Sequence, residues 1–197
     1  MSEAIEIAVS ALEGATSTGC VTVREMGLQG MLTVRADLSS KVVKAAVKAL
    51  TQVAIPKPRR VSISKGAGVA WMSPDELLIL LPYTKAVEAS VALDKALAGT
   101  HALVENVSDA RAVFTVSGPD ARDVLAKLSP VDLSDDNFAK GEIRRSRLAQ
   151  IPAAFWMSGD ASARHEEMTI VVFRSVAKYA FDVLSNASSG GPVKFYS

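Results

Sequence analysis

The stretch AVFTVSGPDARDVLAKL, residues 112–128, contains the pattern on which the predicted fold depends. An apolar run suited to a buried strand is followed by a turn at Gly118 and Pro119, and then by the apolar spacing of a helix. Such a turn can bind phosphate when several backbone N–H groups are free at the helix start. Here there is one glycine, Pro119 lacks an N–H group, and Asp120 adds negative charge. We therefore interpret the turn as a structural corner and not as a phosphate site.

The order strand–helix–strand–strand–strand–helix occurs twice along the chain, and the opening stretch begins the second pass. In the first pass, an apolar stripe from Val42 to Leu50 marks the first helix, and Thr84 is the expected N-cap of the second. The first pass comprises MLTVRAD (31–37), SSKVVKAAVKAL (39–50), RRVSI (59–63), VAWM (69–72), ELLILL (76–81) and TKAVEASVALDKAL (84–97). The second comprises AVFTVSGPD (112–120), ARDVLAKL (121–128), IRRSRLA (143–149), PAAFWM (152–157), MTIVVF (168–173) and SVAKYAFDVL (175–184).

Matching residue pairs support an internal duplication. Arg59-Arg60 precedes Trp71-Met72 at the spacing at which Arg144-Arg145 precedes Trp156-Met157, which puts the two tryptophans at equivalent places. Helices that return over short antiparallel strands pack on one sheet face. The sequence therefore predicts an α+β fold built from two related halves.

The predicted halves form one compact unit with an additional segment at each end. Residues 1–20 are an N-terminal extension, 21–100 the first α+β half and 101–187 the second. Residues 188–197 end in a Ser/Gly-rich stretch that we expect to be a flexible tail.

Composition excludes several classes of protein. The 197 residues are 49% hydrophobic and 22% charged, and the formal net charge is +1, so neither nucleic acid nor a membrane is an expected partner. The single cysteine, Cys20, can form no internal disulfide and no cysteine zinc cluster. The N-terminus lacks a basic signal-peptide region, and no apolar run approaches the roughly 20 residues of a membrane helix. We expect a cytoplasmic protein.

Chemical motifs are sparse. His101 and His165 are the only histidines, and no H-x-x-x-H, C-x-x-C, G-x-S-x-G or Walker pattern is present. The paired arginines could bind an anion. Arg and Lys also commonly protect a solvated strand edge from pairing with another strand, and we favour this second interpretation. Arg111 and Arg174 could cover apolar surface with their stems or contact a partner. We predict no catalytic residue and no metal site.

Three stretches carry a family resemblance: VSDARAVFTVSGPDARDVLAKLSPVDL (107–133), WMSPDELLILLP (71–82) and RSVAKYAFDVL (174–184). Together they resemble the gamma subunit of heterotetrameric sarcosine oxidase, over nearly the whole chain. That family is similar to the folate-binding fold of the glycine-cleavage T protein, which is itself built from related α+β halves. The resemblance therefore implies the duplicated fold that the element order predicts.

The resemblance implies a structural subunit without an active site of its own, in a complex with alpha, beta and delta subunits. That complex oxidatively demethylates sarcosine to glycine and forms hydrogen peroxide and methylenetetrahydrofolate. FAD, FMN, NAD, zinc and tetrahydrofolate are implied on the other subunits, and no cofactor on this chain.

One candidate ligand residue is carried over from the T protein. Asp132, in PVDL, matches its functional aspartate, but LAQIPAAF (148–155) replaces the Asn-Glu-x-Gly-Gly turn that follows it there. The neighbouring Asp135 and Asp136 favour a solvated loop. An independent folate-binding protein or one-carbon (aminomethyl) transferase that uses Asp132 is the alternative hypothesis, and a homo-oligomeric scaffold is the third.

Overall fold

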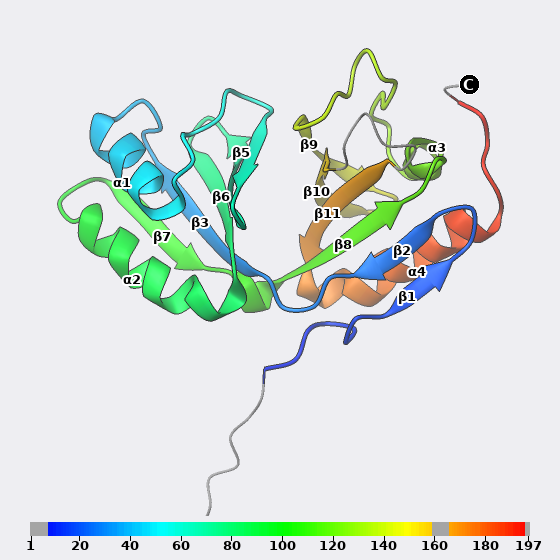
Figure 1. Ribbon diagram of the computed structural model, residues 1–197, viewed down its shortest axis with the longest axis horizontal. Coiled ribbons are helices and arrows are strands. Elements are labelled where there is room, and N and C mark those ends of the chain that lie inside the picture. The colour runs from blue at the N-terminus through cyan, green and yellow to red at the C-terminus, as the bar shows by residue number, and fades with distance from the viewer. Residues whose placement is uncertain (1–7, 159–165, 196–197) are drawn as a thin grey trace, which may run out of the picture.

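The computed structural model describes residues 8–158 and 166–195, and in this part of the chain two antiparallel sheets lie between helices (Figure 1). The first sheet runs, in spatial order, β4 (Val61–Ser64), β5 (Ala67–Ser73), β6 (Glu76–Leu81), β3 (Gly30–Ala36) and β7 (Ala102–Asn106). The second runs β1 (Thr16–Thr18), β2 (Thr22–Glu25), β8 (Arg111–Ser117), β11 (Glu167–Phe173), β10 (Ile151–Met157) and β9 (Ile143–Leu148).

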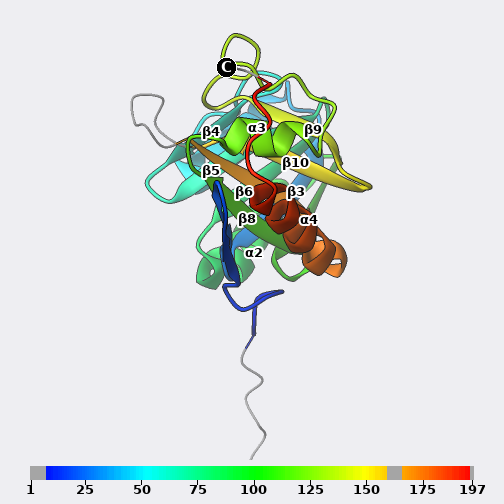
Figure 2. The ribbon, with the colours of Figure 1, turned by 90° about the vertical axis from the view of Figure 1, so that its right-hand side faces the viewer.

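Helices cover the outer face of each sheet, as Figures 1 and 2 show from two sides. Helices α1 (Lys41–Thr51) and α2 (Ala86–Ala96) pack on the first sheet, whereas α3 (Ala121–Ala126) and α4 (Ala177–Ser189) pack on the second. Short 3-10 turns, η1 (Tyr83–Lys85), η2 (Ser108–Ala110) and η3 (Arg174–Val176), precede α2, β8 and α4. The inner faces meet in a third apolar cluster that includes Met31, Leu78, Val113 and Trp156. The layers are therefore helix, sheet, sheet, helix.

The predicted duplication of element order is confirmed. Each half runs strand–helix–strand–strand–strand–helix, from β3 to α2 and from β8 to α4. The strands also pair alike, because the order β4-β5-β6-β3 in one sheet matches β9-β10-β11-β8 in the other. The α+β class with two related halves follows from this equivalence.

The predicted equivalence of the two tryptophans is wrong. Trp71 packs against the cluster beneath α1 and α2, whereas Trp156 is buried on the inner face between the sheets. Successive side chains of a strand alternate between faces, so an offset of one residue reverses the face. An irregular register between Trp71 and Ser73 on β5 shows how strand alignment and sequence spacing can diverge.

Each half contributes strands to the sheet of the other. β2, within the range expected for the first half (21–100), pairs with β8, and β7, just past residue 100, pairs with β3. The long strands β3 and β8 would otherwise be open edges on which another chain could pair. The exchange ties the halves together, and sheet membership does not coincide with the boundaries expected at residues 20 and 100.

Two helix termini differ from their predictions. Thr84 lies inside the turn η1 and is not an N-cap; α2 begins at Ala86 without a side-chain cap. Helix α4 continues to Ser189, past the predicted end at Leu184 and into the predicted tail, because Ala187 and Ser188 are buried. The Ser188 hydroxyl accepts from the Val21 N–H and donates to its carbonyl, which binds the end of α4 to the β1–β2 hairpin.

Replacing Gly30 with alanine is expected to lower the free energy of unfolding by about 2 kcal/mol, in the range of overpacked buried sites. An added Cβ would lie 2.7 Å from the carbonyl oxygens of Leu81 and Pro82, where β3 begins beside β6. Urea unfolding measures the change. Gly190→Ala is the matched control, because its Cβ would meet nothing closer than the Asn186 carbonyl at 3.8 Å. Equal stability of the two variants would contradict the argument.

Candidate functional site

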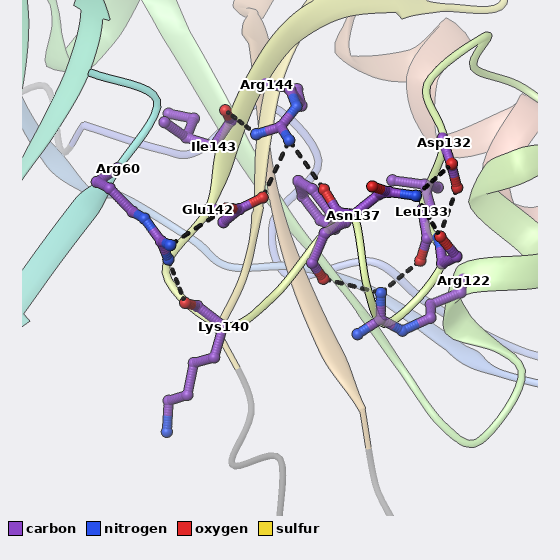
Figure 3. A network of polar contacts seen from close by, with 11 residues as sticks. Arg60, Arg122, Asp132, Leu133, Asn137, Lys140, Glu142, Ile143 and Arg144 are labelled. Atoms are coloured by element: carbon purple, nitrogen blue, oxygen red, sulfur yellow. Dashed lines mark hydrogen bonds and ion pairs between the residues drawn. The ribbon is translucent and has the colours of Figure 1, made fainter. Parts of the chain in front are cut away.

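Asp132 lies in the loop between α3 and β9 and is exposed. Its carboxylate accepts hydrogen bonds from the Ser134 backbone N–H at 3.0 Å and from the Asn137 side-chain amide at 2.8 Å (Figure 3). These bonds, the Ser134 backbone bond foremost, hold the pKa of the Asp132 carboxyl below its ordinary value of 3.8. Both carboxylate oxygens therefore already serve the loop itself.

Asp132→Ala is expected to destabilise the fold at pH 7, and the difference from wild type is expected to shrink in acid. The folded-state pKa lies below the unfolded value of 3.8, so the carboxylate stabilises above that pH and loses its contribution as the pH falls through the folded-state pKa. Urea midpoints between pH 7 and pH 3 test this. Asp136→Ala, an exposed carboxylate in the same loop, is the control. A difference that grows with acid would contradict the sign.

Arg122 organises the same loop from the first turn of α3. Its Nε donates to the Glu166 carboxylate at 2.6 Å, and its Nη1 donates to the carbonyls of Leu133 and Phe138. Its Nη2 lies 2.9 Å from the exposed Asp135 carboxylate. The Arg122 side chain is only 12% exposed, and the side chains of Leu133 and Phe138 are buried. Arg122 therefore donates the hydrogen bonds that water would otherwise donate to the backbone carbonyls of these two residues.

A chain of polar contacts connects this loop with the first half (Figure 3). Arg60 donates to the Lys140 carbonyl at 3.2 Å and lies 3.2 Å from Glu142. Arg144 contacts the other oxygen of Glu142 at 3.0 Å and donates to the Asn137 carbonyl at 2.9 Å. Asn137 is the residue that binds Asp132, so the contacts run without a break from Arg60, just before β4, to the Asp132 loop.

The solvated strand edge that the sequence favoured for the paired arginines is present, because β4 and β9 are the outer strands of their sheets and Arg59, Arg60 and Arg145 are exposed. Arg60 joins an isolated bridge to Glu142, and Arg59 has a positive φ and lies before β4. Arg144 and Arg145 point to opposite faces of β9, as expected for a strand. Arg145 donates to the Met72 carbonyl at 3.1 Å and lies 3.4 Å from Glu76 on the first sheet. Two of the four side chains, Arg60 and Arg145, connect the halves, whereas the contacts of Arg144 lie within the second half.

Two clefts open between the sheets. One, of about 290 Å³, is lined by Arg111, Arg145, Glu76, Phe173 and apolar side chains. The other, of about 340 Å³, is mainly apolar and is lined in part by Trp156, Met26 and Thr169. Asp132 lines neither cleft, so the structure does not bring the one sequence-predicted ligand residue to either of them.

Arg111 and Phe173 form a cross-strand pair at the first cleft. They lie directly opposite on β8 and β11, and the guanidinium carbon is 3.8 Å from the centre of the ring. Burial lowers the pKa of the Arg111 guanidinium below its usual range. The sequence singled out Arg111 but not its partner, since the pairing of residues 111 and 173 requires the strand register.

Cys20 and Arg174, which the sequence also singled out, line neither cleft. Cys20 is a partly buried free thiol, and Arg174 donates to the Val9 carbonyl at 2.9 Å. His165 lies outside the described residues. Within residues 8–158 and 166–195, no three His, Cys, Asp or Glu side chains are grouped as metal ligands, and no helix there is long and apolar enough to cross a membrane.

Known proteins resemble this chain in sequence and in structure. Residues 35–190 match the model of the sarcosine oxidase, gamma subunit family. Sarcosine oxidase subunit gamma of Corynebacterium sp. (strain P-1) is 32% identical, over 82% of this chain and 78% of the relative. The corresponding protein of Arthrobacter sp. is 31% identical over 82% and 78%.

Two solved structures resemble it as well. A chain of the heterotetrameric sarcosine oxidase from Corynebacterium sp. U-96 superposes with a TM-score of 0.77 at 30% identity, over 86% of this chain and 84% of that one. Aminomethyltransferase T of the glycine cleavage system from Bartonella henselae gives a TM-score of 0.56 at 14% identity, over 79% of this chain and 43% of that one. The similarity to aminomethyltransferase T is therefore a similarity of fold alone.

Proposed function

The chain belongs to the sarcosine oxidase gamma subunit family, and from that premise we propose that it is a structural subunit of a heterotetrameric sarcosine oxidase, without an active site of its own. The observation that supports a structural role is that several of its charged side chains are engaged in contacts within the chain itself. Arg60 and Arg145 connect the halves. Arg122, Asp132 and Arg144 hold the loop between α3 and β9. Groups fixed in this way are ill suited to proton transfer at a substrate.

The chemistry of the complex then belongs to the partners. We propose alpha, beta and delta subunits as those partners, with FAD, FMN, NAD, zinc and tetrahydrofolate held by them, and a cytoplasmic location. The complex would oxidatively demethylate sarcosine to glycine, with hydrogen peroxide and methylenetetrahydrofolate as further products. This chain would contribute contact surface.

Purification of the tagged chain from its native host under mild conditions tests the proposal. The flavin-containing subunits and sarcosine-dependent peroxide formation are expected in the same fraction, whereas the chain expressed alone is expected to turn over no sarcosine. Recovery of a lone chain would contradict membership of the complex. Sarcosine oxidation by the lone chain would contradict the structural role.

The second candidate is an independent folate-binding protein or aminomethyl transferase that uses Asp132. The likeness of fold to aminomethyltransferase T favours it. The engagement of both Asp132 oxygens by Ser134 and Asn137 weighs against it, because a ligand would have to displace those bonds. Calorimetric titration with tetrahydrofolate, with Asp132→Asn as the comparison, decides between the candidates. Saturable heat that the substitution abolishes would favour the second.

A further inference from the structure

The cleft that contains Arg111 lies between the inner faces of the two sheets. Arg111 and Phe173 come from the second sheet, and Glu76 and Leu78 from the first. The cleft volume of about 290 Å³ is near the lower end of the range for small-molecule sites. A small ligand, with one polar group and an apolar body, fits such a space.

The Arg111 guanidinium has uncommitted hydrogen-bond donors. The guanidinium stacks on the ring face of Phe173, and the Glu76 carboxylate attracts it, but no carboxylate or carbonyl of the described residues is seen to accept a hydrogen bond from it. Stacking on a ring engages the plane of the guanidinium and leaves the N–H groups around its edge free. Burial makes such free donors costly unless a ligand or water accepts from them. The contact with Phe173 therefore fixes the plane of the guanidinium and leaves its donors unused.

The charges that line this cleft favour an anion. Two guanidinium groups, Arg111 and Arg145, accompany a single carboxylate, Glu76, so the lining has one positive charge in excess. Arg145 is held in place by Glu76 and by the Met72 carbonyl, so Arg111 is the cation that remains for a ligand. A fixed planar guanidinium matches the two oxygens of a carboxylate.

We propose that this cleft is a binding site for the carboxylate of a small organic acid, with Arg111 as its anchor and the apolar wall around Leu78 and Val171 in contact with its body. The site lies away from the Asp132 loop, so it is independent of the folate alternative. The site is tested first on the lone chain, and that step does not depend on the structural role.

Benzoate and its neutral analogue benzamide test the site on the full chain, by two-dimensional NMR titration. Benzoate is expected to bind saturably in the millimolar range, and benzamide roughly tenfold more weakly, because it lacks the charge. Arg111→Met should weaken benzoate about 10- to 100-fold, and Arg111→Lys, which keeps the charge without the planar fork, should weaken it less. Arg147→Met, an exposed position on β9 outside the cleft lining, is the control.

Equal affinity for benzoate and benzamide, or unchanged benzoate binding by a folded Arg111→Met variant, would overturn the proposal. Thermal unfolding confirms that each variant is folded, and Arg111→Lys replaces Arg111→Met if the latter is not. The titration is then repeated on the complex that co-purifies with the chain. Benzoate binding by the complex would support a site for a free organic acid. Binding by the lone chain alone would show that the cleft is covered in the complex and would overturn the small-acid site.

Discussion

Replacing Arg122 with methionine is expected to lower the free energy of unfolding by about 3 kcal/mol, although the residue lies in the first turn of a helix of only six residues. Methionine keeps an apolar stem but donates no hydrogen bond. The carbonyls of Leu133 and Phe138 would lose their donor while their side chains stay in the core of the second half. The Glu166 carboxylate would lose its ion pair as well.

Urea unfolding at neutral pH measures the loss, and amide hydrogen exchange locates it. Faster exchange is expected for the backbone N–H groups of Asn137 and Phe138, which donate to the Ser134 carbonyl within this loop. Arg147→Met, on an exposed position of β9, is the control and is expected to change stability by less than about 0.5 kcal/mol. A loss below about 1 kcal/mol for Arg122→Met would show that packing alone holds the loop.

Hydrophobic periodicity was sufficient to predict the order of elements within each repeat, but it did not predict the strands β1, β2 and β7. Runs such as 77–81 and 170–173 are apolar throughout because β6 and β11 are covered on one face by helices and on the other by the opposing sheet. The face to which a strand residue points, and the strands that the two halves exchange, could be known only from the tertiary structure. The position of Trp156 on the inner face depends on the register of β10 against β11, and the pairing of β7 with β3 involves residues some 70 positions apart.

The candidate sites show the same division between local and long-range information. Asp132 and Arg111 are recognisable in the sequence as polar residues next to apolar elements. The contacts that determine their roles are local for Asp132, which binds Ser134 and Asn137, and long-range for Arg111, which meets Phe173. Arg122 was missed because a helix-start arginine next to acidic residues is typical of a solvated surface, and only the fold of the following loop buries it.

Replacing Trp156 with alanine is expected to lower the free energy of unfolding by about 4 kcal/mol, the largest loss among these substitutions. Trp156 is 2% exposed and packs between the two sheets with Met31 and Val113. Its removal leaves a void at the contact between the halves that strands fixed on both sides cannot close. Trp71→Ala, at a partly buried position beneath the helices of the first half, is the comparison and is expected to cost about half as much.

Trp156→Phe separates the packing of the indole from its N–H group. The Nε1 atom is buried and has no hydrogen-bond partner among the described residues, so phenylalanine removes an unsatisfied donor together with part of the ring. These effects oppose each other, and a loss of only about 1 kcal/mol is expected by urea unfolding. A loss near that of alanine would mean that the N–H group has an acceptor in solution. Since Trp156 lines the apolar cleft of about 340 Å³, that acceptor would be a water or ligand held there, and the cleft would then contribute to the stability of the fold.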